Sequence, residues 1–159
     1  RRSGSDEEGR GYMRQLSETG KYTVSDRVLR AVQAEFSCGF CTDAQGAQTI
    51  GKTFRENHYL LDTHTAVACT VLDAYRSGTG DQTLTVVEST ASPFKFCASV
   101  LDALGVTEHA PGTGVLGQLT AETGRPAPTP LASLAGKPVR FDQVTDRGDM
   151  RAVVTEFLR

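Results

Sequence analysis

Hydrophobic residues recur at helical spacing through the first third of the chain. A serine or threonine that can cap a helix stands before each of three such runs, and a glutamate or glutamine completes a capping-box pattern in the first and third. The predicted helices cover about 6–18, 26–36 and 43–57, behind Ser5, Ser25 and Thr42. In the second run, four apolar residues share one face and predict a buried stripe, namely Val28, Leu29, Val32 and Phe36.

The middle of the chain has the pattern of a helix, a strand and a helix. Asp62 or Thr63 can cap a helix over about 64–76, and a glycine-containing break follows it. Residues 83–89 are β-branched and mostly apolar, which is typical of a strand covered on both faces. Ser92 is a suitable cap for a further helix with proline at its first position.

This arrangement predicts polar side chains at two helix starts. The carboxyl end of the strand would lie beside the helix that begins at Pro93, with Thr90 and Ser92 between them. Ligands bind at that edge in open α/β sheets, and free amides at a helix start attract phosphate or carboxylate. His64 and Thr65 stand at the other helix start and could face the same kind of anion.

Each of these residues also has an ordinary structural explanation. Capping alone explains Ser92, Thr90 can simply end the strand, and His64 can be a structural histidine. Lys95 is typical of a solvated surface charge, although a cation in the first turn of a helix opposes the helix dipole and so favours a ligand there. The residues alone therefore indicate an α/β domain with one candidate anion-binding crevice.

The pattern loosens after Gly105. Loop-forming residues surround a short predicted helix at 115–123. A turn near 131–134 then leads to an extended stretch at 137–144 and a last helix over about 146–158. Helices that alternate with few strands predict an α/β piece whose sheet is completed by a partner segment.

Composition narrows the class of partner. A chain of 159 residues with 38% hydrophobic residues can bury one core, which predicts one domain. The net charge of -2 gives no basic surface for nucleic acid or an anionic membrane, and no apolar run reaches the roughly 18–20 residues of a membrane span. We therefore expect a cytoplasmic protein that binds a small molecule or another protein. Its opening stretch, RRSGSDEEGRGYM, has no initiator methionine and is typical of a cut fragment.

Four cysteines stand at positions 38, 41, 69 and 97. Cys38 and Cys41 have C-x-x-C spacing, but a zinc ribbon needs a second such pair, and Cys69 and Cys97 stand alone in apolar stretches. A thioredoxin-like pair would open a helix after a buried strand, whereas this pair follows a helical run. We expect buried or half-buried free thiols and no bound metal, with a metal site or a redox pair as the alternatives.

Two motifs resemble the C-terminal region of the threonine synthases. That family carries Asp-Pro-His-Thr-Ala-Val at the start of a helix and, after a later strand, Ser-Thr-Ala-His-Pro-Ala-Lys-Phe. Here these read DTHTAV at 62–67 and STASPFKF at 89–96. The resemblance extends to the stretches 20–36, 41–62 and 130–144. The chain departs from the family pattern at Thr63, where the family has proline, and at Ser92, where it has histidine.

The resemblance implies an α/β fold, as the C-terminal fragment of a fold type II pyridoxal-phosphate enzyme with few strands flanked by helices. Such an enzyme is a carbon–oxygen lyase of threonine biosynthesis that converts O-phosphohomoserine and water into threonine and phosphate. The Schiff-base lysine and the glycine-rich phosphate loop of the family would lie upstream, in the N-terminal part of the same chain, so Lys95 does not have that role. The isolated fragment is then expected to be inactive and not to retain pyridoxal phosphate.

By its position in the motif, Thr90 is expected to be the hydroxyl partner of the pyridine nitrogen. A hydroxyl there, in place of a carboxylate, leaves that nitrogen largely unprotonated. Further candidates are the rest of the cofactor wall and the residues that could orient the cleft or the substrate phosphate, namely Ser89, Ala91 and Ser92, and His64, Thr65 and Lys95.

One threonine synthase-like C-terminal domain over 1–159 is expected, with a helical lead-in over 1–61, an α/β unit with both motifs over 62–105 and a C-terminal extension over 106–159. Two other functions stay open. One is a threonine synthase-like protein that has lost catalysis and acts as a binding module. The other is a metal-dependent interaction domain that uses Cys38 and Cys41.

Overall fold

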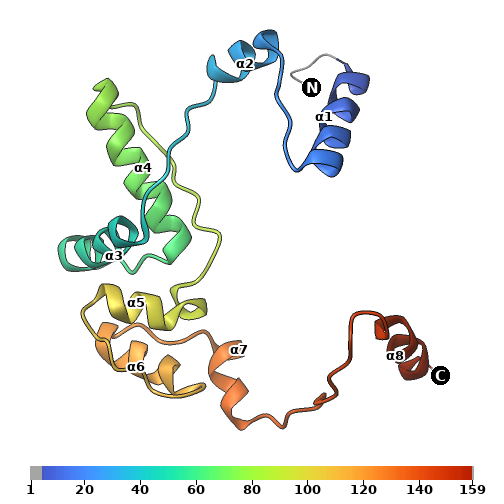
Figure 1. Ribbon diagram of the computed structural model, residues 1–159. Coiled ribbons are helices and arrows are strands. Elements are labelled where there is room, and N and C mark those ends of the chain that lie inside the picture. Colours follow the sequence, from blue (N-terminus) through green and yellow to red (C-terminus); the bar gives the residue numbers. More distant parts are fainter. Residues whose placement is uncertain (1–4, 159) are drawn as a thin grey trace.

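The computed structural model describes residues 5–158. Its α-helices are α1 Asp6–Thr19, α2 Asp26–Gln33, α3 Asp43–Asn57, α4 Thr63–Thr79, α5 Cys97–Ala103, α6 Gly114–Thr123, α7 Thr129–Ala132 and α8 Met150–Phe157, and its short 3-10 helices are η1 Pro93–Lys95 and η2 Ser133–Gly136. Figure 1 shows α3 to α6 stacked together, with α1 and α2 beyond one end and α8 at the end of a long arm. None of the helices in this described range has the length and apolar character needed to cross a membrane.

Helix starts follow the capping signals in the sequence. The Thr42 hydroxyl accepts the Gln45 amide and the Gln45 side chain accepts the Thr42 amide, so the predicted capping box of α3 is confirmed. Asp62, and not Thr63, is the cap of α4. This helix continues past its predicted end at 76 and stops at Gly80, whose φ of 73° is the left-handed conformation that glycine adopts without strain.

Helices α1 and α2 are linked through the carboxylate of Glu8. It accepts the hydroxyls of Tyr12 at 2.6 Å and Ser25 at 3.0 Å, and it pairs with Arg27 at 2.9 Å. Ser25 stands at the N-cap position of α2 as predicted, but its hydroxyl donates to Glu8 and makes no cap hydrogen bond. The link between these helices is therefore polar.

The predicted buried stripe on α2 is correct only in part. Val28 is buried and Val32 is half-buried, whereas Leu29 and Phe36 are exposed. The helix also ends at Gln33, short of the predicted end at 36. Helical periodicity gives the face of a helix but not the surface that covers it, and α2 stands away from the stacked helices (Figure 1).

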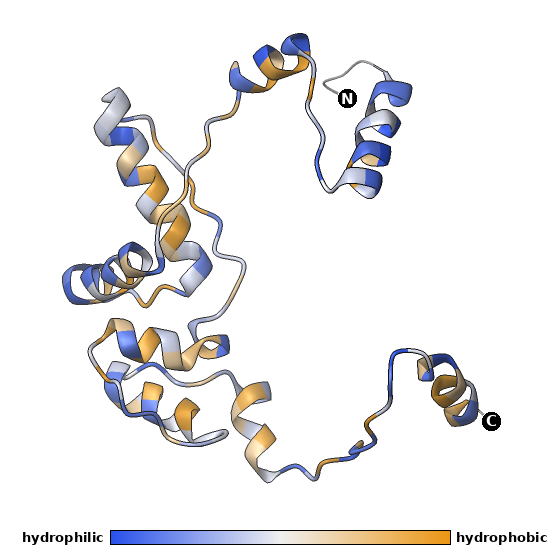
Figure 2. Cartoon of the chain, in the orientation of Figure 1, coloured by the Kyte–Doolittle hydropathy of each residue, from blue (hydrophilic) through white to orange (hydrophobic). Residues whose placement is uncertain are grey.

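The hydrophobic core lies between α3, α4, α5, η1 and α6. Its buried members are Ile50, Leu60, Leu61, Ala66, Phe94, Cys97, Val100, Leu101 and Leu119. Helix α5 approaches α3 closely at Gly51, where an added Cβ would lie 2.6 Å from the carbonyl oxygen of Ala103. Figure 2 shows hydrophobic residues also on α8, which stands apart from these helices.

The strand predicted at 83–89 is wrong, since none of residues 5–158 forms a strand. The segment runs as coil from the end of α4 to η1 (Figure 1). A strand requires a neighbour that pairs with its backbone amides and carbonyls, and no other segment in the described part of the chain supplies that ladder. The expected fold class of few strands flanked by helices is therefore corrected to helices alone for this part.

One side of this coil is held against α4. The Nη2 atom of Arg76 donates to the carbonyl of Thr83 at 3.1 Å and to the hydroxyl of Thr85 at 3.2 Å. Residues 82–86 are all exposed, with Leu84 at 93% and Val86 at 85%. The segment is thus attached to α4 through Arg76, while the apolar side chains of Leu84 and Val86 lie open to solvent.

The helix predicted to begin at Pro93 is split in two. Ser92 accepts the amide of Phe94 at 3.3 Å, which confirms its prediction as a cap. Phe96 has φ of -129° and ψ of 37°, outside the helical region, and separates η1 from α5. The predicted stop at Gly105 is confirmed by its φ of 91°. The last helix, α8, is shorter than the predicted 146–158.

His58 ends α3 in a left-handed conformation with φ of 52°. Because a side chain in that region costs about 1 kcal/mol, we expect His58→Gly to raise the free energy of unfolding by about 0.5–1 kcal/mol in urea denaturation. The matched control is Glu56→Gly in the helical last turn of α3, which should lower it by up to about 1 kcal/mol. A loss of stability in both variants would contradict the assigned strain at His58.

Candidate functional site

The start of α4 is built around the carboxylate of Asp62, which is only 1% exposed. Its Oδ1 atom accepts the amides of His64 at 2.9 Å and Thr65 at 3.2 Å. These two bonds cap the helix and occupy the amides that an external anion would otherwise use. The protein thus supplies its own negative charge at this helix start.

The other carboxylate oxygen of Asp62 joins the two motifs. Oδ2 accepts the hydroxyl of Thr65 and, at 3.4 Å, the hydroxyl of Ser89. The hydroxyl oxygens of Thr65 and Ser89 lie 3.0 Å apart. Because Asp62 and Thr65 belong to the first motif and Ser89 to the second, this Asp62–Thr65–Ser89 network holds together segments that are separated by α4 and the following coil.

A ring contact also joins the motifs. The ring centroids of His64 and Phe96 are 5.0 Å apart, with an angle of 49° between the planes. The Nδ1 atom of His64 lies 3.6 Å from Oδ1 of Asp62, while 67% of the His64 side chain is exposed. His64 therefore borders the network and keeps most of its imidazole accessible to solvent.

The network keeps Asp62 ionised. Burial alone would raise the pKa of its carboxyl group, but hydrogen bonds from the Thr65 hydroxyl, the Thr65 and His64 amides and the Ser89 hydroxyl outweigh burial and lower the pKa below its ordinary value. At neutral pH this buried group is thus an anion that accepts from both neighbouring hydroxyls.

Stability should depend on the ionisation of Asp62. The unfolded chain binds this proton near pH 3.8 and the folded chain only at lower pH, so the contribution is fully present above that value and is lost as pH falls through the folded pKa. We expect the free energies of unfolding of the wild type and Asp62→Asn, from urea denaturation, to differ by about 1–3 kcal/mol at pH 7, and we expect this difference to shrink progressively as pH is lowered below 3.8. A difference that stays constant over this range would contradict the ionised network.

The second motif contributes three hydroxyls with different surroundings. Ser89 belongs to the network, and Ser92 accepts an amide as the cap of η1. Thr90 is exposed, and its hydroxyl makes no hydrogen bond within residues 5–158. Ala91 is half-buried and Lys95 is exposed. The structure therefore brings His64, Thr65 and Ser89 together and leaves the Thr90 hydroxyl available to a partner.

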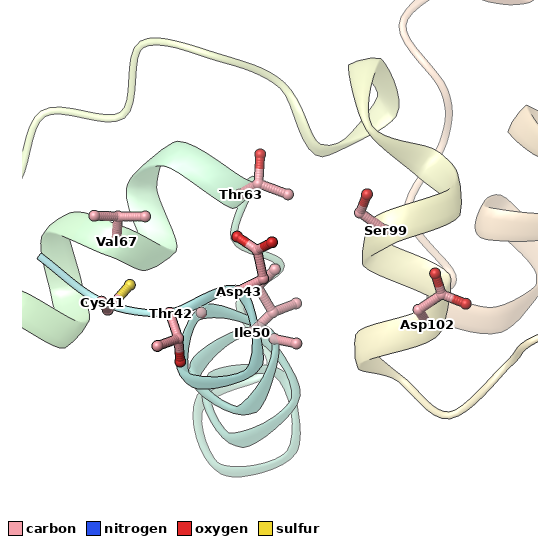
Figure 3. A pocket seen from close by; sticks show the side chains of 10 residues that line it. Cys41, Thr42, Asp43, Ile50, Thr63, Val67, Ser99 and Asp102 are labelled. Carbon is pink, nitrogen blue, oxygen red and sulfur yellow. The ribbon is translucent and has the colours of Figure 1, made fainter.

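A cavity of about 300 Å³ lies beside this region, between the starts of α3 and α4 and the side of α5 (Figure 3). Its polar lining includes the carboxylates of Asp43 and Asp102 and the hydroxyls of Thr63 and Ser99. No basic side chain is among the described residues that line it, so it is poorly suited to phosphate. It is also separate from the predicted crevice, because Thr90 is not part of its lining.

All four cysteines are free thiols in the structure. The described residues 5–158 contain no group of three or more His, Cys, Asp or Glu side chains placed to hold a metal ion. Burial raises the pKa of the Cys69 and Cys97 thiols, with Asp73 adding to the effect at Cys69. Cys38 is exposed, which corrects the expectation that every cysteine is at least half-buried.

Asp62, the centre of the site, could be predicted from the sequence only as a possible helix cap. The spacing of Asp62 and Thr65 is that of an ordinary capping pattern. The further contact with Ser89 depends on how the chain returns after α4. No local sequence signal reports that return.

The known proteins to which this chain is similar include threonine synthases and threonine synthase-like proteins. Among curated proteins, the chain is 32% identical to threonine synthase of Schizosaccharomyces pombe over 94 residues, which cover 58% of this chain and 18% of that protein. It is 27% identical to Threonine synthase-like 1 of Homo sapiens over 93 residues, which cover 58% of this chain and 12% of that protein. The solved structure of PLP-bound threonine synthase from Brucella melitensis has a TM-score of 0.54 and 29% identity, and the match covers 78% of this chain and 25% of that chain.

The match to a protein family includes most of the candidate site. Residues 65–155 match the family described as "Threonine synthase, C-terminal", and this range contains Thr65 and the whole second motif. The chain spans a quarter or less of the length of the relatives named above. Since the family match covers more than half of the 159 residues, the chain belongs to the threonine synthase C-terminal family.

Proposed function

We propose that this chain is the C-terminal part of a pyridoxal-phosphate-dependent threonine synthase, a lyase that converts O-phosphohomoserine and water into threonine and phosphate. Membership of the family supports the reaction class. The observation that carries the proposal is the contact between Thr65 and Ser89, whose hydroxyl oxygens lie 3.0 Å apart. It brings the two family motifs into one site and leaves Thr90 exposed beside it.

The donor set at this site fits a neutral pyridine nitrogen. Thr90 has an exposed hydroxyl that can donate one hydrogen bond. The carboxylate of Asp62 is buried and engaged with Thr65 and Ser89, so it does not offer the negative charge that would stabilise a protonated ring. When bound, pyridoxal phosphate supplies an electron sink for carbanions, and a neutral nitrogen moderates that sink. In this proposal Thr90 binds the nitrogen, and Ser89, Ala91 and Ser92 form the wall beside it.

The other candidates have different proposed roles. Thr65 is 4% exposed, so it acts by holding Ser89 and does not touch the substrate. His64 and Lys95 are exposed at the edge of the site. Lys95 is proposed to attract the substrate phosphate, and the His64 imidazole, seated against Phe96, to orient it.

The proposed partner of this chain is the N-terminal part of the same enzyme. We assign to that N-terminal part the lysine that holds the cofactor covalently and a strand that pairs with residues 83–87. The exposure of Leu84 and Val86 supports the strand, because both side chains are typical of a covered sheet. The unit over 62–105 would then become an α/β unit only in the assembled enzyme, between the helical lead-in over 1–61 and the extension over 106–159.

The 159-residue chain on its own should not catalyse the reaction. Purified chain incubated with pyridoxal phosphate should release no phosphate from O-phosphohomoserine above the rate without protein, and it should give no imine absorbance band. The Brucella melitensis threonine synthase is the positive control. Sustained phosphate release by the chain alone would overturn the assignment of the cofactor lysine to another segment. In a longer protein, substrate binding without turnover would instead indicate the catalytically silent binding module.

A further inference from the structure

We infer that Asp62 is a positioning residue for the proposed cofactor site, because its carboxylate fixes Ser89 and thereby the adjoining Thr90. This inference rests on the proposed function, since the position of Thr90 matters only if its hydroxyl has a ligand. Asp62 itself does not touch the ligand, because it is buried beneath the contacts with Thr65 and Ser89.

The coil that carries Ser89 and Thr90 has few other attachments. At one end, Arg76 and Asp81 bind Thr83, and Arg76 binds Thr85. At the other end, Ser92 caps η1. Between these ends, the hydrogen bonds of the described structure that reach the coil are those of the Ser89 hydroxyl with the network. The hydrogen bonds that order the coil at 89–90 are therefore those with Asp62 and Thr65.

The network also explains why Thr90, and not Ser89, is the available donor. Each hydroxyl carries one hydrogen. The Thr65 hydroxyl is placed to donate to Oδ2 of Asp62 and to the Ser89 oxygen, and the Ser89 hydrogen is directed to the same carboxylate. Ser89 can then present only lone pairs to a ligand. Since a neutral pyridine nitrogen is an acceptor, it needs the hydrogen of Thr90.

The test uses the 159-residue chain, labelled with ¹⁵N and studied by NMR without cofactor. Asp62→Asn keeps a good helix cap but removes the anionic acceptor. We expect the amide signals of Ser89 and Thr90 to shift and their heteronuclear NOE values to fall to that of Leu84. The matched control is Asp73→Asn, which removes an exposed carboxylate from the same helix and should leave both residues unchanged. Unchanged signals of Ser89 and Thr90 in Asp62→Asn would overturn the inference.

A second variant protects the test against misfolding. Ser89→Ala leaves the cap of α4 intact and breaks only the coil side of the network, so residues 89 and 90 should lose order while the start of α4 keeps its order. If Thr90 keeps its wild-type NOE in Ser89→Ala, Asp62 has no positioning role. The readout needs no cofactor. The two proposals can therefore fail separately. If residues 89 and 90 lose order as expected but a longer protein binds no pyridoxal phosphate, Asp62 still positions this coil and the proposed function is refuted.

Discussion

Replacing Gly51 with alanine should lower the free energy of unfolding by about 2 kcal/mol, as measured by urea denaturation followed by helical circular dichroism. An ideal Cβ at this position lies 2.6 Å from the carbonyl oxygen of Ala103 and 2.9 Å from a guanidinium nitrogen of Arg55. The Arg55 side chain can move away, but the Ala103 carbonyl belongs to the backbone of α5. Helices α3 and α5 must therefore separate, which opens the core next to Ile50 and Leu101.

Gly46 is the matched control for this prediction. It is buried in the same helix, yet an added Cβ would meet only the Sγ atom of Cys41, at 4.0 Å. Alanine is a better helix former than glycine, so Gly46→Ala should raise the free energy of unfolding by up to about 1 kcal/mol. Similar losses in both variants would show that the close approach of α5 to α3 at Gly51 is not what limits the side chain there.

In the assembled enzyme, Thr90→Val should lower the rate of phosphate release from O-phosphohomoserine by about 10- to 100-fold. Valine keeps the shape of threonine but removes the hydrogen-bond donor, and leaving a buried acceptor unpaired costs about 1–3 kcal/mol. Thr90 is exposed in this chain, so the free energy of unfolding should change by less than about 0.5 kcal/mol. The assay is phosphate release, with the absorbance spectrum of the bound cofactor as the second readout.

Two variants control for other effects of this substitution. Thr90→Ser restores the hydroxyl and should retain most of the wild-type rate. Thr107→Val changes an exposed threonine outside both motifs and should have no effect. If Thr90→Val has the wild-type rate and spectrum, Thr90 is not part of the cofactor site.

Local signals predicted much of the helical structure. The capping box of Thr42 and Gln45 gave the correct start of α3, and Ser92 is a cap as expected, because a cap depends on residues within one turn. The exact ends were less predictable. The φ and ψ of Phe96 break the helix expected after Pro93, and the contact of its ring with His64 lies outside any local pattern.

Predictions from the sequence were wrong for segments whose structure or burial depends on another segment. Residues 83–87 have the composition of a strand, but strand structure requires backbone pairing with another segment, and none is present in residues 5–158. The same reason applies to Leu29 on α2 and Phe157 on α8, whose helical faces were predictable but remain exposed. Of the candidate site, the two helix starts could be predicted, whereas the contact of Ser89 with Asp62 depends on tertiary structure.

The most direct test of the proposed site is the ¹⁵N chemical shift of the pyridine nitrogen in the assembled enzyme loaded with ¹⁵N-labelled pyridoxal phosphate. We expect the shift of a neutral, hydrogen-bonded nitrogen in the wild type, and a change toward the value of a nitrogen without a donor in Thr90→Val. A protonated pyridinium in the wild type, or the same shift in both proteins, would contradict the assignment of Thr90 as its partner.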